Sequence, residues 1–300
     1  MAKTFTRVRN ALLMPLTGTL DNFSAGVFAD GVCLPASLQE RASAAKALPP
    51  LRHLPGDYIF GGYFFHHYGH FMLESLSRLY AIKQCKKLPL LFMCLQKTIP
   101  QQHAEIFQLV GLDSADITFV HEPVSVDSII VSPAGVGISP PFMLPEQMAA
   151  LGQVKEAKII PGKKIWLSRS NYLLTRGGSG VLNEMKLDKA LMEMGWEIVA
   201  PELLTSVKQQ LLTITSAEYV AGFDGSAFYT TLLAQVLKGH YIIFGRRNGI
   251  CPTIVHMLEQ KGADLTKYVL DVTNVYQENG KKMLFVLPDL TAVTDKLAHI

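Results

Sequence analysis

The residues of this chain that are best suited to chemistry lie in the segment HHYGHFMLESLSRLY, residues 66–80. Its His70, Glu74 and Arg78 follow one another at intervals of four, and residues four apart lie on one face of a helix. Histidine and glutamate can exchange protons with a substrate, and arginine can bind its oxygen atoms. With His67 three positions before His70, this row of titratable groups predicts a working site for acid–base chemistry.

The same residues also have an ordinary structural interpretation. Glu74 and Arg78 could form a solvated ion pair worth a few tenths of a kcal/mol, and the histidines could be loop residues. A metal site is disfavoured, because His70 and Glu74 lack the second histidine of the H-E-x-x-H pattern and no nearby Cys or Asp offers a third ligand. The apolar run at 58–60 favours the functional interpretation, because ligands of α/β proteins bind where a strand ends and a helix begins.

Two arginines in the second half of the chain could bind phosphate. Arg169 lies in the segment SRSN, residues 168–171, directly after the apolar stretch KIWL, and Arg176 follows shortly afterwards. Forked guanidinium donors suit phosphate oxygens, and each charge-assisted contact contributes about 1.5–3 kcal/mol. Asn183 and Glu184 then open a helix. The ordinary alternative is a pair of surface arginines beside a glycine-rich turn.

A second phosphate-binding candidate is the turn Gly222-Phe223-Asp224-Gly225-Ser226, between an expected buried strand and a helix. Gly225 and Ser226 would lie at the helix start, where unpaired backbone N–H groups and the helix dipole attract anions. Ser226 could equally serve only as the N-cap. The turn matches neither G-x-G-x-x-G nor the Walker A loop, and no G-x-S-x-G elbow is present. The pattern therefore excludes dinucleotide and ATP fingerprints and a serine hydrolase, but it suits an isolated diphosphate.

Regular elements must position these groups, and the hydrophobic pattern predicts them in both halves of the chain. Strands alternate with helices, which is typical of parallel sheets covered by helices on both faces. We expect helices at 36–48, 69–83, 101–112, 146–157, 183–194, 206–215 and 226–237, strands at 88–93, 117–120, 128–131, 164–167, 196–199, 219–221 and 241–244, and a long loop at 132–145. The chain is therefore predicted to form two α/β domains, residues 1–155 and 156–300, with the last helix free to pack back on the first domain.

Composition bounds the class of protein. A chain of 300 residues, 49% of them hydrophobic, can bury two cores. The formal charge of +3 is too small to indicate a nucleic-acid partner. Four scattered cysteines without a C-x-x-C pair are typical of reduced thiols in the cytoplasm. No window of about 18 residues lacks charge and proline, so we expect no membrane span. Peripheral association with the inner face of the membrane and the oligomeric state stay open.

Three blocks in register resemble glycosyltransferase family 61. They are FFHHYGHFMLESLSRLY, then WLSRSN with Arg176 and the pair NE before a helix, then AEYVAGFDGSAFYTTLLA. The resemblance implies a GT-B-like architecture of two Rossmann-type domains with parallel sheets facing a central cleft. It also implies inverting transfer from a nucleotide sugar without an essential metal or cofactor. Bacterial members of the family commonly serve the synthesis of capsular or other surface polysaccharides.

On this resemblance the first domain binds the acceptor, an oligosaccharide or lipid-linked glycan. His70 is the candidate base that removes the proton of the acceptor hydroxyl, and Glu74 orients it or is the alternative base. His67 and Arg78 lie on the acceptor side. The second domain binds the diphosphate and sugar of the donor through Arg169, Arg176, Asn183, Glu184, Asp224, Gly225 and Ser226.

One position departs from the family pattern. Members often have His before the Gly-Ser or Gly-Ala pair of the third block, where this chain has Asp224. A carboxylate beside a diphosphate is repulsive unless it points to the ribose or to the sugar hydroxyls. Two other functions therefore stay open. One is a non-catalytic sugar- or nucleotide-binding subunit, and the other is a polysaccharide modifier such as a pyruvyl transferase.

Overall fold

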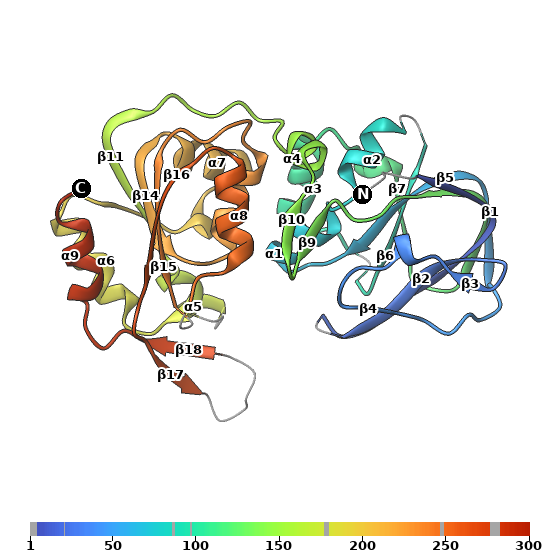
Figure 1. Ribbon diagram of the computed structural model, residues 1–300, viewed down its shortest axis with the longest axis horizontal. Helices are drawn as coiled ribbons and strands as arrows, with labels where there is room; N and C mark the ends of the chain where they lie inside the picture. The colour runs from blue at the N-terminus through green and yellow to red at the C-terminus, as the bar shows by residue number, and fades with distance from the viewer. Residues whose placement is uncertain are drawn as a thin grey trace. The chain divides into compact units, whose positions relative to one another are not determined.

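The structure is a computed structural model that divides into two compact units, residues 1–153 and 154–300 (Figure 1). It describes residues 5–20, 22–85, 88–96, 98–176, 180–246, 249–276 and 283–300. No helix within these ranges is long and apolar enough to span a membrane. Each unit has its own sheet and its own hydrophobic core.

The first unit is built on a mixed sheet. Its strands are β1 (Thr6–Gly18), β2 (Phe23–Ala29), β3 (Val32–Cys33), β4 (Ala42–Ala44), β5 (Arg52–Phe64), β6 (Leu90–Cys94), β7 (Ile117–Val120) and β8 (Val124–Val131). The strand order is β3-β2-β1-β8-β5-β6-β7, with β4 paired to β2. Strands β8, β5, β6 and β7 are parallel neighbours, whereas β1 is antiparallel to β2 and β8. The prediction of a parallel sheet is therefore wrong for part of this unit.

The antiparallel part comes from the first 50 residues, where the prediction also placed a helix at 36–48. That helix is wrong, because the segment contains only the 3-10 turn η1 (Pro35–Ser37) and strand β4. Pairing of β4 with β2 overrides the helix propensity of its alanines. The predicted loop at 132–145 contains the short hairpin of β9 (Val136–Ile138) and β10 (Pro141–Met143).

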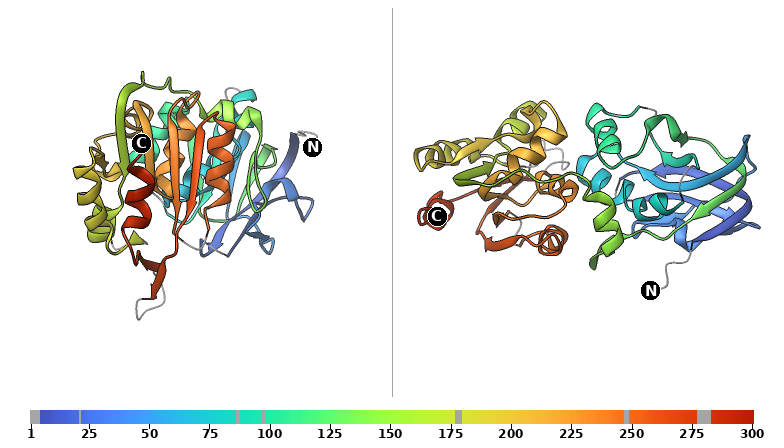
Figure 2. Two further views of the ribbon diagram at one scale, coloured as in Figure 1. Left: turned by 60° about the vertical axis from the view of Figure 1, so that its left-hand side comes forward. Right: turned by 90° about the horizontal axis from the view of Figure 1, so that it is seen from above.

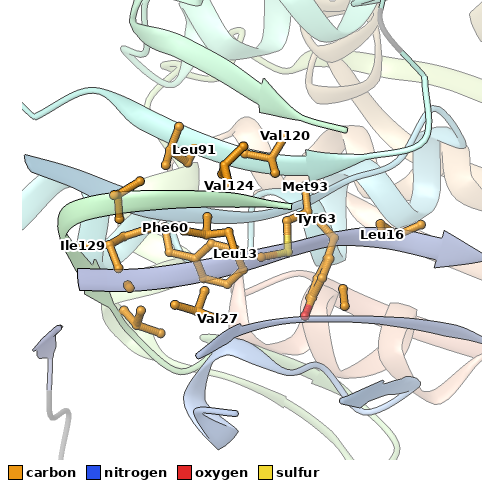
Figure 3. Packing of buried hydrophobic residues seen from close by; sticks show 14 of the residues in the cluster. Leu13, Leu16, Val27, Phe60, Tyr63, Leu91, Met93, Val120, Val124 and Ile129 are labelled. Carbon is orange, nitrogen blue, oxygen red and sulfur yellow. The ribbon is translucent and has the colours of Figure 1, made fainter. Parts of the chain in front are cut away.

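Helices of the first unit pack on the sheet through aromatic side chains. They are α1 (Tyr68–His70), the π-helical η2 (Phe71–Ser75), α2 (Leu79–Gln84), α3 (Gln101–Leu109), the 3-10 turn η3 (Ser114–Asp116) and α4 (Pro145–Leu151). Phe64, the last residue of β5, contacts the rings of Phe71 and Phe107, so it fixes η2 and α3 against the strand. A separate core gathers aliphatic and aromatic side chains from β1, β2, β5, β6, β7 and β8 (Figure 3).

The second unit is built on a sheet in which all neighbours are parallel. Its strands are β11 (Ile160–Leu167), β13 (Glu197–Val199), β14 (Ala217–Phe223), β15 (His240–Gly245) and β16 (Asp264–Val269). They lie in the order β13-β11-β14-β15-β16. This half confirms the predicted parallel α/β fold. A smaller sheet consists of β12 (Gly180–Val181), β18 (Met283–Val286) and β17 (Thr273–Tyr276).

Helices cover both faces of the parallel sheet. They are α5 (Ser170–Arg176), α6 (Glu184–Glu193), the 3-10 turn η4 (Pro201–Leu203), α7 (Val207–Thr215), the 3-10 helix η5 (Ser226–Leu233), α8 (Pro252–Gln260) and α9 (Thr291–Leu297). Helices α6 and α9 lie on one face, with α7 and α8 on the other (Figure 2). Val293 and Leu297 of α9 are buried in the core that also contains Trp166, so the last helix packs within the second unit.

Each sheet has a position at which the chain reverses its direction of progress across the strands. In the second unit this position lies between β11 and β14, because the chain passes from β11 to β13 on one side and returns to β14 on the other. In the first unit it lies between β5 and β8. Ligands of open α/β sheets bind beyond the carboxyl ends of the strands at such a switch point. His70 follows β5, Arg169 follows β11, and Asp224 follows β14.

Candidate active site

The candidate base of the first unit lies beyond the carboxyl end of β5. His70 ends the helical turn α1, and Glu74 lies in η2. His70 Nδ1 and Glu74 Oε2 are in hydrogen-bond contact. Arg41, directly before β4, donates to the same carboxylate oxygen, and its Nη2 lies 2.9 Å from His70 Nδ1. The structure therefore brings the two predicted catalytic residues together and adds a cation that the sequence did not indicate.

The proton between His70 and Glu74 can be assigned from the charge of the carboxylate. Burial alone would raise the pKa of Glu74, but hydrogen bonds from His70 and Arg41 outweigh it and lower the pKa. Glu74 is therefore ionised at neutral pH and can only accept, so His70 Nδ1 donates to it. In the neutral ring Nε2 is then the nitrogen that can take up a proton. A carboxylate that fixes the tautomer in this way is the usual partner of a histidine base.

The helix that carries these residues is not a regular α-helix. In η2 the N–H of Leu76 bonds the carbonyl of Phe71, five residues earlier, and the backbone leaves helical geometry at Arg78 before α2 begins. A wider turn rotates the following side chains relative to those before it. The prediction that Arg78 shares a face with His70 and Glu74 is therefore wrong, because that prediction assumed 3.6 residues per turn.

Arg78 is instead wholly buried in the framework of the first unit. Its Nε donates to the carbonyl of Ser132, beyond the end of β8, at 2.9 Å. Its Nη2 donates to the carbonyl of Ala36 at 3.0 Å, and its guanidinium carbon lies 4.9 Å from the centre of the Phe60 ring. Burial lowers the pKa of Arg78 to about 10, so it stays charged at neutral pH. Arg78 thus ties the segment leading to Arg41 to the end of β8.

His67 lies at the edge of the same site. Its side chain is exposed, and its ring centre is 4.9 Å from that of His70. It is therefore close enough to contact a substrate that reaches the base. The positions of His67, His70 and Glu74 agree with a single site at the carboxyl edge of the first sheet.

In the second unit, Arg169 and Gly225 lie side by side at the switch point. They follow β11 and β14, which are parallel neighbours. A Cβ atom placed on Gly225 would lie 3.0 Å from Arg169 Nη1, so the guanidinium passes directly over the glycine. Gly225 has an extended φ of 179°, which any residue adopts, so the absence of a side chain provides space rather than conformational freedom. The guanidinium carbon of Arg169 also lies 5.2 Å from the centre of the Tyr172 ring.

The other predicted donor residues surround this contact in different ways. Ser226 is the first residue of η5, and Gly225 occupies the N-cap position; among the described residues no side chain caps the helix. Asn183 holds the start of α6, because its amide donates to the carbonyl of Leu287 at 2.7 Å and accepts from its N–H at 3.0 Å. Arg176 ends α5, but its side chain and residues 177–179 lie outside the described residues.

Glu184 is buried directly behind Arg169. Its Oε1 accepts a hydrogen bond from the backbone N–H of Arg169 at 3.0 Å, whereas its Oε2 has no hydrogen-bond partner within the described ranges. Burial raises the pKa of Glu184 to about 7, and the nearby Asp188 acts in the same direction. Asp188 accepts hydrogen bonds from Ser168 and Ser170 at 2.8 and 2.7 Å, and burial raises its pKa as well. This pair of acids anchors the turn that follows β11.

Asp224 does not point into open space, because both of its carboxylate oxygens are bound. Oδ1 lies 3.1 Å from Nε of Arg246, which also donates to the Asp224 carbonyl at 2.6 Å. Oδ2 accepts from the backbone N–H of Cys251 at 3.1 Å. Both Asp224 and Arg246 are buried. The negative charge of Asp224 is therefore balanced by an arginine that directly follows the next strand, β15.

The order of these elements and the residues at their ends agree with a known family. The model of the family described as Glycosyltransferase 61 matches residues 68–237, which is more than half of the chain. The chain belongs to glycosyltransferase family 61. A search of curated proteins found no match. As a member of family 61 the protein is a glycosyltransferase, which binds a sugar donor and an acceptor. Family membership thus gives sugar transfer as the activity of the protein.

Two site residues of this family 61 enzyme were not predicted from the sequence. They are Arg41 and Arg246. Arg246 follows an apolar strand, as Arg169 does, so the same rule about carboxyl ends could have found it. Arg41 carries no local signal, because it lies in an irregular segment and meets Glu74 only through the tertiary fold. Within the described part of the chain, no group of three or more His, Cys, Asp or Glu side chains could hold a metal ion.

Proposed function

We propose that this enzyme is an inverting, metal-independent glycosyltransferase that moves a sugar from a nucleotide-sugar donor to a hydroxyl of a glycan. The first unit supplies the base and binds the acceptor, and the second unit binds the donor. The observation that carries the proposal is the contact of His70 with Glu74 and Arg41. It gives a histidine of fixed tautomer at the carboxyl edge of a sheet, where a substrate hydroxyl can reach it.

The proposed reaction is a single displacement. His70 Nε2 takes the proton of the acceptor hydroxyl while the hydroxyl oxygen forms a bond to the anomeric carbon. On the opposite face, the bond between that carbon and the donor phosphate oxygen breaks, and the nucleotide leaves with the electron pair. Glu74 stabilises the imidazolium that forms. A positioned base of this kind contributes about 100- to 10,000-fold to the rate.

The departing nucleotide needs positive charge that is already in place when its bond breaks. The guanidinium of Arg169 over Gly225 and the uncapped start of η5 at Ser226 support such a role, and Arg176 is proposed to add a second cation. Glu184 and Asn183 hold the turn and the helix that border the donor. Because the reaction joins groups from both units, we propose that they face each other across a cleft in the active enzyme, as in the GT-B architecture.

The biological setting follows from the family resemblance. We propose an oligosaccharide or lipid-linked glycan as acceptor, in the synthesis of a bacterial capsular or other surface polysaccharide. The reaction would then take place in the cytoplasm, with the enzyme peripherally associated with the inner face of the membrane. No nucleic-acid partner is proposed.

Incubation with UDP-, GDP-, CMP- and dTDP-linked sugars tests the proposal. A true donor should release its nucleotide, even by slow hydrolysis. It should also stabilise the protein by about 2.7 kcal/mol at 100 times its dissociation constant. Activity should persist in EDTA, and the product should have the opposite anomeric configuration to the donor. Dependence on a divalent cation would contradict the metal-independent part, and retention of configuration would contradict the single displacement. Failure of every donor to bind would contradict the donor site.

A further inference from the structure

Arg246 is a cation at the donor edge that no part of the proposed mechanism yet uses. It directly follows β15, the strand next to β14, and it is buried at 6% exposure. The guanidinium is fixed at one end, because Nε donates to both the carbonyl and the carboxylate of Asp224.

The other end of this guanidinium lies near Gly225. A Cβ atom placed on Gly225 would lie 3.5 Å from Arg246 Nη2 and 3.0 Å from Arg169 Nη1. Two guanidinium groups, which follow the strands on either side of β14, therefore converge on one residue that has no side chain. Each arginine is positioned by an acid. The side chain of Arg246 donates to Asp224, and the backbone N–H of Arg169 donates to Glu184.

The placement of the two guanidinium groups, rather than the net charge of the cluster, favours an anion beside Gly225. Arg246 is paired with Asp224, and the acids Glu184 and Asp188 lie near Arg169; burial raises the pKa of Glu184 to about 7, so its negative charge is incomplete at neutral pH. The start of η5 at Ser226 adds backbone N–H groups to the same side. A diphosphate provides oxygens on two adjacent phosphorus atoms, which suits two forked donors that converge from different directions.

We infer that Arg246 binds the diphosphate of the donor together with Arg169, and that Asp224 is the positioning residue that fixes its guanidinium. This inference rests on the proposed donor site of the second unit. It gives Asp224 a role that does not require contact with the ribose or the sugar. The carboxylate stays turned away from the diphosphate, because Arg246 and the Cys251 N–H occupy its two oxygens.

Titrations with nucleoside diphosphates test the inference. UDP, GDP, CDP and dTDP are first compared on the wild-type enzyme, and the tightest is used throughout. R246Q should weaken its binding by about 10- to 100-fold, the worth of a charge-assisted contact. R246K, which keeps the charge and loses the fork, should lie between R246Q and the wild type. The corresponding nucleoside without phosphates should bind all variants equally. K267Q removes an exposed cation of the same unit and should leave binding unchanged.

The role of Asp224 is tested by whether D224N strengthens or weakens the binding of the nucleoside diphosphate. If its carboxylate simply repelled the diphosphate, D224N would strengthen binding. If Asp224 positions Arg246, D224N should weaken binding, and the double variant D224N/R246Q should bind as R246Q does. Circular dichroism and thermal unfolding check that each variant is folded. If D224N does not fold, the affinity of R246K for the nucleoside diphosphate still tests whether the geometry of the Arg246 guanidinium matters for binding.

Different results would contradict the role of Arg246, the role of Asp224 and the proposed donor site. Normal affinity in R246Q, together with lost affinity in R169Q, would overturn the role of Arg246 and leave the donor site in place. Stronger binding by D224N would overturn the positioning role of Asp224. Normal affinity in both R169Q and R246Q would contradict the donor site itself.

Discussion

Replacement of Glu184 by glutamine should stabilise the second unit at high pH and have little effect at low pH. The folded protein raises the pKa of Glu184 from 4.5 to about 7, chiefly through burial. A carboxyl whose pKa is raised on folding binds its proton more tightly in the folded state. Its contribution to stability is therefore fully present below pH 4.5 and is lost as the pH rises towards 7.

The size of the effect follows from the two pKa values. One pKa unit corresponds to 1.36 kcal/mol, so ionised Glu184 costs the folded state about 3 kcal/mol above pH 7. E184Q keeps an oxygen that can accept from the Arg169 N–H, and it removes the charge. The variant and the wild type should therefore have similar free energies of unfolding near pH 4.5. Above pH 7 the variant should be more stable by about 3 kcal/mol.

Tryptophan fluorescence gives a suitable assay. Both tryptophans of the chain, Trp166 and Trp196, lie in the core of the second unit, so urea unfolding followed by fluorescence reports on this unit. Measurements from pH 4.5 to 9 should show a difference between E184Q and the wild type that grows up to pH 7 and then levels off. E193Q, at the exposed end of the same helix, is the control and should show no such trend. A difference that does not change with pH would contradict a raised pKa of Glu184 in the folded protein.

Two further predictions concern the first unit. R41Q removes the cation that donates to Glu74 beside His70, so kcat should fall by roughly 10-fold while nucleotide affinity stays unchanged. This loss is a part of the rate enhancement of about 100- to 10,000-fold that a positioned base contributes. Recovery by R41K would support this role, and an unchanged kcat would contradict it. G61A places a Cβ atom 2.4 Å from the buried Phe92 ring and should cost about 1–3 kcal/mol in the free energy of unfolding. G180A, whose Cβ meets Leu173 at 3.6 Å, is its control, and equal stability of both variants would refute the overpacking argument.

The second unit could be predicted from sequence because its signals are local. Strands β11, β13, β14 and β15 each contain a short apolar run that leads into a helix or 3-10 helix, and parallel strands bring their carboxyl ends to one edge. Arg169 and Gly225 therefore meet as the spacing of strands and helices suggests. Arg246 follows the same rule after β15. The partners of Asp224 could not be predicted, because they depend on the register of three strands and on the start of α8.

The first unit was less predictable because its pairing is long-range. Strand β1 pairs with β8 from the far end of the unit, and no hairpin turn between them marks the register. The prediction that His70, Glu74 and Arg78 share one face assumed a uniform α-helix. A single π-helical stretch keeps the first two in contact and sends Arg78 into the core. Such a stretch is set by tertiary packing of residues such as Phe71, and the hydrophobic period does not reveal it.

The most direct test of the mechanism separates donor binding from the transfer step. It compares nucleotide affinity and kcat for H70N with those of the wild type, using the donor identified by nucleotide release. We predict that H70N binds the nucleotide within about twofold of the wild type, while kcat falls by about 100-fold or more. Near-normal turnover by a folded H70N enzyme would contradict the assignment of the base, and loss of nucleotide affinity would contradict the division of labour between the two units.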